Sequence, residues 1–106
     1  MFLAKVEGSV VSTKKSPSMD GRKLLLLRPQ LVDDKDPTKF RNGANTIVAV
    51  DSVGAGIGEM VLFCQGSSAR MAPNMKDAPV DAVIIGIVDV VDVLGKEVYN
   101  GNNKVA

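Results

Sequence analysis

The chain has 106 residues and a net charge of +1, with 13 basic and 12 acidic side chains. This length fits a single domain, and the balanced charge argues against a nucleic-acid-binding surface, which is typically strongly basic. The sequence contains no histidine, so it lacks the commonest general base and metal ligand, and an enzyme is the less favoured class. Its one cysteine, Cys64, cannot form an internal disulfide and is expected in the core.

The sequence predicts neither a signal peptide nor a membrane span. The N-terminus lacks the basic start and long apolar run of a signal peptide. The longest uncharged apolar run, residues 82–88, is much shorter than a membrane span. We therefore expect a soluble, intracellular protein with no membrane partner.

Strand-forming residues dominate the N-terminal segment. Residues 2–13 mix apolar and polar side chains in the manner of a strand, with Gly8 as a candidate bulge. The leucine-rich run 22–28 is too short for a helix and ends at Pro29, so it is predicted as a second strand. The dipeptide Asp20-Gly21 between the two runs predicts a tight turn.

A charged segment, residues 31–43, is expected to form a solvated loop. Its acidic residues Asp33, Asp34 and Asp36 superficially suggest a calcium loop. The spaced acidic pattern, the central glycine and the distal glutamate of such a loop are absent. We therefore expect no metal site here.

A glycine-rich loop, Asp51-Ser52-Val53-Gly54-Ala55-Gly56-Ile57-Gly58-Glu59, joins two further predicted strands, residues 44–50 and 59–65. A dinucleotide fingerprint needs a helix after its glycines, and a P-loop needs Gly-Lys-Ser/Thr. Neither follows here, so a tight strand-to-strand turn is the preferred interpretation. A nucleotide-binding module using this loop remains an alternative.

The C-terminal part contains one long run, residues 80–93, that is rich in valine and isoleucine and therefore favours a strand. Gly86 in its middle predicts a bend or bulge of the kind small barrels need. Asp89 and Asp92 have an odd spacing and cannot share a face of a regular strand, so they do not form a catalytic pair. A polar tail follows Gly95.

Five strands with glycine bends in a chain of this length predict an all-β fold, a small five-stranded OB-like barrel. At most a short helical turn is expected, at residues 67–71. Residues 1–95 are predicted to form the barrel domain and residues 96–106 the polar C-terminal tail. Ser67 and Ser68 follow a glycine but lie in no G-x-S-x-G motif, so we expect no catalytic residue there.

Several motifs, in one order along the chain, resemble the EutN/CcmL family. The most specific are Asp51-x-Val53-Gly54-Ala55-Gly56-x-Gly58-Glu59 and Gly66-Ser67-Ser68-Ala69-Arg70. The other matching motifs are Val6-x-Gly8-x-Val10-Val11-x-Thr13-x-Lys15, Lys23-Leu24-Leu25 and Pro79-Val80-Asp81-Ala82-x-Ile84-x-Gly86-Ile87-Val88-Asp89. Several motifs in order are far more specific than one glycine loop.

The resemblance implies a structural shell protein: a pentameric vertex that caps the corners of a bacterial microcompartment. A sheet of hexagonal tiles closes into a polyhedron only if pentagons occupy its corners. The expected partners are four further copies of the chain, as a homo-pentamer, and hexameric microcompartment shell proteins. The expected location is the shell, in the bacterial cytoplasm. No cofactor, metal or nucleic acid is expected.

The same resemblance assigns two sets of residues. The loop at the ring axis, where small residues let five backbones converge beside a narrow pore, comprises Gly54, Ala55, Gly56 and Ile57. The expected subunit interface comprises Asp51, Glu59, Ser67, Ser68 and Arg70. In the interface, the Arg70 guanidinium is expected to reach the neighbouring subunit, with Asp51 and Glu59 as the candidate acids.

The alternative from another class is an OB-fold module that binds single-stranded nucleic acid or a nucleotide. Such modules stack bases on aromatic side chains in a basic groove. This chain has three phenylalanines, one tyrosine and no tryptophan, and its charge is balanced. The composition therefore favours the structural interpretation.

Overall fold

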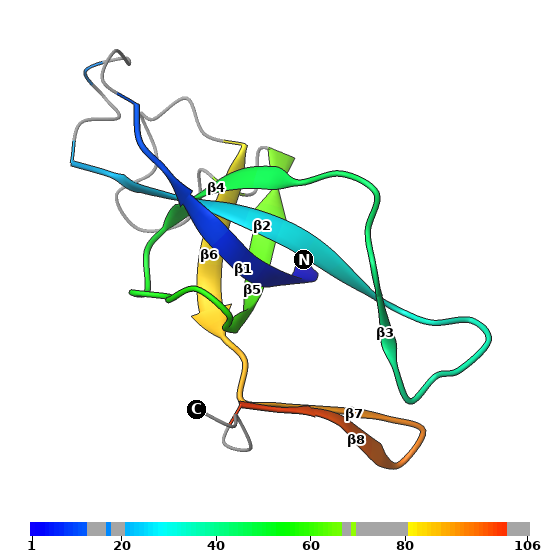
Figure 1. Ribbon diagram of the computed structural model, residues 1–106. Helices are drawn as coiled ribbons and strands as arrows, with labels where there is room; N and C mark the ends of the chain where they lie inside the picture. Colours follow the sequence, from blue (N-terminus) through cyan, green and yellow to red (C-terminus); the bar gives the residue numbers. More distant parts are fainter. Residues whose placement is uncertain (13–16, 18–20, 67–68, 70–80, 102–106) are drawn as a thin grey trace.

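The computed structural model of the chain describes residues 1–12, 17, 21–66, 69 and 81–101. These residues form β-strands and connecting turns without an α-helix (Figure 1). The strands are β1 (Phe2–Val10), β2 (Lys23–Val32), β3 (Phe40–Asn42), β4 (Ile47–Asp51), β5 (Met60–Gln65), β6 (Ala82–Ile87), β7 (Val90–Val93) and β8 (Lys96–Asn100). The helical turn expected at residues 67–71 lies outside the described residues, apart from Ala69.

Five of these strands close into a barrel. They follow the order β1-β5-β6-β4-β2, and β2 pairs again with β1 to complete the circle. All of these pairings are antiparallel except that of β4 with β6. The predicted all-β, five-stranded barrel is therefore confirmed.

The barrel interior is filled by aliphatic side chains that alternate along the strands. In β2, Leu25 and Leu27 are buried, and in β1 Ala4 and Val6 are buried, which is the period of two that a strand imposes. Phe63 of β5 is the largest fully buried side chain. The main cluster contains Ala4, Val6, Leu25, Leu27, Ala49, Ala55, Val61, Phe63, Ala82 and Ile84.

Two bulges bend the barrel strands, both beside glycines that the sequence had indicated. In β1, the register with β2 shifts between Val6 and Gly8, so that Glu7 is the extra residue. In β6, the register with β5 shifts beside Gly86. Bulges increase strand twist and curvature, which a five-stranded barrel requires to close.

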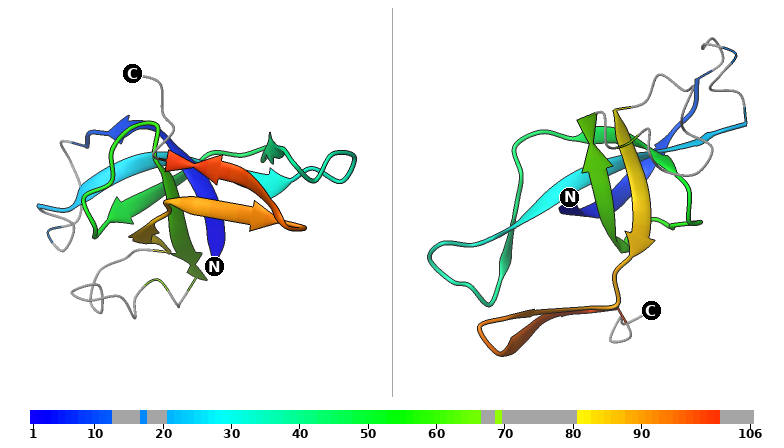
Figure 2. Two further views of the ribbon diagram at one scale, coloured as in Figure 1. Left: turned by 90° about the horizontal axis from the view of Figure 1, so that it is seen from below. Right: turned by 180° about the vertical axis from the view of Figure 1, so that it is seen from behind.

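Strand β2 and the segment after it differ from the expectation. Strand β2 does not end at Pro29 but continues to Val32, and the expected loop 31–43 contains strand β3, which pairs with the end of β2. Pro29 lacks an N–H, and it lies where β2 leaves β1 and begins to pair with β3. Its carbonyl accepts a hydrogen bond from the Gly43 N–H at 2.8 Å. We call residues 30–42 the arm, because they project from the barrel (Figures 1 and 2).

The long strand expected at residues 80–93 is instead two strands. β6 belongs to the barrel, and β7 pairs with β8 in a separate two-stranded sheet. The residues expected to begin the polar tail, 96–100, form β8. The chain turns away after β6, where the Val88 N–H donates to the Met60 carbonyl at 2.8 Å. The β7–β8 hairpin lies beyond one end of the barrel (Figures 1 and 2).

Candidate functional site

The glycine loop, residues 51–59, is organised around the carboxylate of Asp51. Oδ1 of Asp51 accepts hydrogen bonds from the backbone N–H groups of Val53 at 3.0 Å and Gly54 at 3.1 Å. Oδ2 accepts from the Ala55 N–H at 2.9 Å. The side chain is only 1% exposed. One buried carboxylate therefore satisfies three successive amides of the loop, which fixes its path.

Lys23 supplies the positive charge that this buried carboxylate needs. Its Nζ lies 3.7 Å from Oδ2 of Asp51 and donates to the Ala55 carbonyl at 3.1 Å. Lys23 and Asp51 are direct partners in the register of β2 and β4. This role of Lys23 could not be predicted from the sequence, because only the strand register brings the two residues together.

The far side of the loop is held by Glu59 and β1. Oε1 of Glu59 accepts a hydrogen bond from the Gly56 N–H at 2.6 Å. The Gly58 N–H donates to the Val6 carbonyl at 2.8 Å. The same carboxylate oxygen would lie 3.2 Å from a Cβ added at Gly56, so a larger residue there would press on it. Both acids of the loop, Asp51 and Glu59, therefore accept hydrogen bonds from backbone amides of their own chain.

Two further contacts tie the loop to the core. The Ala55 methyl is fully buried and belongs to the main hydrophobic cluster. The Ser52 hydroxyl donates to the Ile84 carbonyl in β6. The loop is therefore not a loose connection but a part of the packed barrel.

The outer surface of the loop is small and apolar. Ile57 is 71% exposed and Val53 is 39% exposed. Gly54 has a φ of +79°, a left-handed conformation that an L-residue adopts only with strain. Of the four residues expected at a ring axis, Gly54 and Ile57 face outward, whereas the Ala55 side chain points into the core.

The remaining predicted interface residues, Ser67, Ser68 and Arg70, lie outside the described residues. Asp51 and Glu59 are described, and the structure brings them to the two ends of one loop. Because the Asp51 side chain is already almost wholly buried in the single chain, it has little surface left for a neighbour. Its influence on an interface would act through the shape of the loop.

The loop geometry also bears on the nucleotide alternative. A phosphate-binding loop presents free backbone N–H groups to its ligand. Here the amides of Val53, Gly54 and Ala55 already donate to Asp51, and the negative carboxylate occupies the place of an anion.

Within the described residues, no group of three or more His, Cys, Asp or Glu side chains is arranged to hold a metal ion. No helix among those residues has the length and apolar content needed to span a bilayer.

Comparison with known proteins identifies the class of protein to which this small closed barrel belongs. Residues 1–89 match the family model described as ethanolamine utilisation protein EutN/carboxysome. The bacterial microcompartment shell vertex protein PduN of Salmonella typhimurium is 51% identical over 89 residues, covering 84% of this chain and 96% of PduN.

Solved structures agree with the sequence match. The structure of Gloeobacter violaceus CcmL is 44% identical, with a TM-score of 0.83, covering 97% of this chain and 100% of that one. The pentameric microcompartment shell protein GrpN of Rhodospirillum rubrum is 41% identical, with a TM-score of 0.72 and coverage of 89% and 99%. The chain belongs to the EutN/CcmL family, so the resemblance inferred from its motifs is confirmed.

Proposed function

We propose that this chain is a structural vertex subunit, which forms a ring of five copies and caps the corners of a bacterial microcompartment shell. The observation that carries the proposal is the family membership over residues 1–89, together with relatives named as shell vertex proteins at 51% and 45% identity. The pentameric relative GrpN supports the number of subunits. The role is structural rather than catalytic.

The physical basis of this function is shape. Flat hexagonal tiles form a closed surface only where five-fold units introduce curvature. A ring of identical subunits closes when one surface of a copy meets a different surface of the next copy at the right rotation. The nearly balanced charge of the chain allows copies to approach one another without strong repulsion.

Two finer statements belong to the same proposal. The ring would meet hexameric shell proteins at its outer edges, and the assembled shell would lie in the bacterial cytoplasm. The names of the relatives as shell and carboxysome vertex proteins support both.

Within the ring, we assign the glycine loop to the five-fold axis and Glu59, Ser67, Ser68 and Arg70 to the subunit interface. The exposure of Gly54 and Ile57 and the internal bracing of the loop by Asp51 support this assignment. A braced loop keeps its shape when five copies converge, which a flexible loop would not do.

Shell co-assembly tests the proposal. The chain, carrying a small electron-dense tag, is co-expressed with the hexameric shell proteins of a related microcompartment, and the purified shells are imaged by cryo-electron microscopy. Tag density at the five-fold corners, together with open or elongated shells when the chain is omitted, is the expected result. Density on the flat facets, or closed shells of normal shape without the chain, would overturn the proposal.

A further inference from the structure

The tip of the β7–β8 hairpin carries an apolar residue in an unfavourable conformation. The hairpin turns at Leu94 and Gly95, with φ values of +52° and +79°. Two-residue turns with positive φ at both positions favour Asn, Asp or Gly at the first one. Leu94 is nevertheless there, 85% exposed. Backbone strain at an exposed apolar residue points to a function rather than to the stability of the single chain.

The outward face of the hairpin also carries two like charges. Asp92 and Glu97 are direct cross-strand partners, and both are exposed. Like charges in this position destabilise a sheet. Within the described part of the chain, neither carboxylate forms an ion pair. Val90, 47% exposed, lies two residues from Asp92 and therefore on the same face.

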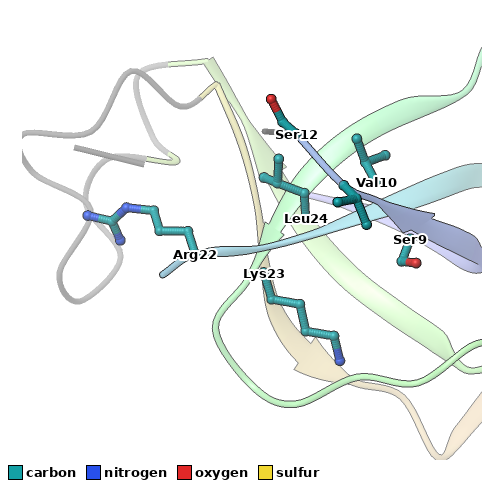
Figure 3. A pocket seen from close by; sticks show the side chains of 7 residues that line it. Ser9, Val10, Ser12, Arg22, Lys23 and Leu24 are labelled. Carbon is teal, nitrogen blue, oxygen red and sulfur yellow. The ribbon is translucent and has the colours of Figure 1, made fainter. Parts of the chain in front are cut away.

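A surface of complementary character lies where β1 ends and β2 begins. Val10, Val11 and Leu24 line a hollow of about 250 Å³ there, together with Arg22 (Figure 3). Val11 is 88% exposed. In Figure 3, Arg22 extends from the start of β2. Lys23 also lines the hollow, but its ammonium donates to the Ala55 carbonyl of the glycine loop. We call this surface the β1–β2 hollow.

A single chain cannot bring the two surfaces together. The hairpin lies at one end of the molecule, and the end of β1 and the start of β2, which border the hollow, lie towards the other (Figures 1 and 2). The molecule is 45 Å long. A second copy of the chain can bring them together. A contact between two different surfaces of identical subunits is the head-to-tail type that generates a ring.

We propose that the β7–β8 hairpin of one copy docks into the β1–β2 hollow of the next copy, with Leu94 as its anchor. Leu94 packs against Val10, Val11 and Leu24 of the next copy, and Asp92 and Glu97 face its Arg22. The contact buries the exposed leucine and brings a cation beside the like-charge pair, which accounts for both unfavourable features. This inference rests on the proposed ring of copies and adds a second contact to the subunit interface assigned above.

The substitution Leu94→Asn separates docking from folding. Asparagine tolerates positive φ better than leucine, so the isolated chain keeps or gains thermal stability. The variant loses the apolar anchor, so the concentration at which half of the rings dissociate rises at least about tenfold, as expected for a central contact residue. The measurement is native mass spectrometry over a dilution series. Unchanged ring dissociation would overturn the proposal.

A charge swap tests the polar part of the contact. Asp92→Lys replaces the like-charge pair of the hairpin with an opposite-charge pair, yet it places a cation against Arg22 of the next copy. Asp92→Lys and Arg22→Glu are each expected to raise the dissociation midpoint about tenfold or more, and the double variant to restore at least part of the loss. Asp34→Lys, the same charge change at an exposed position of the arm, is the control and leaves the midpoint unchanged. Additive losses in the double variant would contradict the pairing.

The two proposals fail in different ways. If the unmodified chain is a pentamer and Leu94→Asn, Asp92→Lys and Arg22→Glu leave it intact, the docking inference is wrong and the vertex function stands. If the unmodified chain is monomeric at high concentration, the ring itself is wrong. A pentamer that dissociates in each of these variants, but not in Asp34→Lys, supports both.

Discussion

Lys23 and Asp51 are direct cross-strand partners, and the Lys23 ammonium lies 3.7 Å from Oδ2 of Asp51 where β4 enters the glycine loop. The pair combines an exposed cation with a carboxylate that is 1% exposed. The same ammonium donates to the Ala55 carbonyl, and the same carboxylate accepts from the Ala55 N–H. Both backbone polar groups of one buried alanine are therefore satisfied by a single ion pair, which fixes the loop to the barrel.

Asp51→Asn is expected to lower the free energy of unfolding by about 1–3 kcal/mol, because the side-chain amide cannot accept hydrogen bonds through both of its ends. At least one of the three loop amides is then left without an acceptor. Chemical denaturation measures the loss. Asp34→Asn, at an exposed position, is the matched control and should change stability by less than about 0.5 kcal/mol. Equal stability of Asp51→Asn and the unmodified chain would show that the carboxylate does not brace the loop.

Gly54→Ala tests the backbone conformation of the loop. A Cβ at this position meets no atom within 4 Å, but φ is +79°, so the cost is one of conformation alone, about 1 kcal/mol. Gly8→Ala provides the comparison, since a Cβ there also meets open space but φ is not in the left-handed region. We expect thermal denaturation to show a clear loss for Gly54→Ala and a smaller change for Gly8→Ala. The reverse order would contradict the assigned loop conformation.

Tyr99 connects the hairpin to the barrel, because its hydroxyl accepts a hydrogen bond from the Met60 N–H at 3.3 Å. Tyr99→Phe removes the acceptor and is expected to cost about 1 kcal/mol. Hydrogen exchange of the Met60 amide should become faster, while the amides of the β2–β4 ladder keep their protection. Exchange at Met60 that does not change would mean that the hairpin is held by other contacts.

The arm contains a carboxyl group with a lowered pKa, that of Asp36. The Thr38 hydroxyl and the Thr38 N–H both donate to the Asp36 carboxylate and lower its pKa, and the hydroxyl has the larger effect. The positive charge of Lys39 makes a smaller contribution in the same direction. Since the folded pKa is lowered, the contact stabilises the arm above the ordinary pKa of aspartate and is lost as the pH falls through the lowered value. NMR titration should show this pKa rising in Thr38→Val and staying low in Thr38→Ser. A pKa that is the same in both variants would rule out the hydroxyl as the main cause.

Local sequence features predicted the barrel well, because its determinants are local. The valine-, isoleucine- and leucine-rich runs gave the barrel strands, and Gly8 and Gly86 marked both bulges. Strands β3 and β8 escaped prediction because their residues are mostly polar, and pairing with a neighbour, not composition, makes them strands. Pro29 was expected to end β2, yet it lies at a change of pairing partner where the missing N–H is tolerated.

The candidate site was only partly predictable. The glycines and the two acids of the loop could be identified from their motif. The hydrogen bonds from three loop amides to Asp51 of the same chain could not. Lys23 was missed because its position beside Asp51 depends on the β2–β4 register, which links residues distant in the sequence. Leu94 was missed because its positive φ could not be predicted from the residues around it.

The native mass of the purified chain tests the central claim most directly. Native mass spectrometry at micromolar concentration should give about 56 kDa, five times the 11.2 kDa of one chain. A mass of about 67 kDa would indicate six copies and would contradict a five-fold vertex, although not the family. A mass of 11.2 kDa that persists at high concentration would contradict the ring itself.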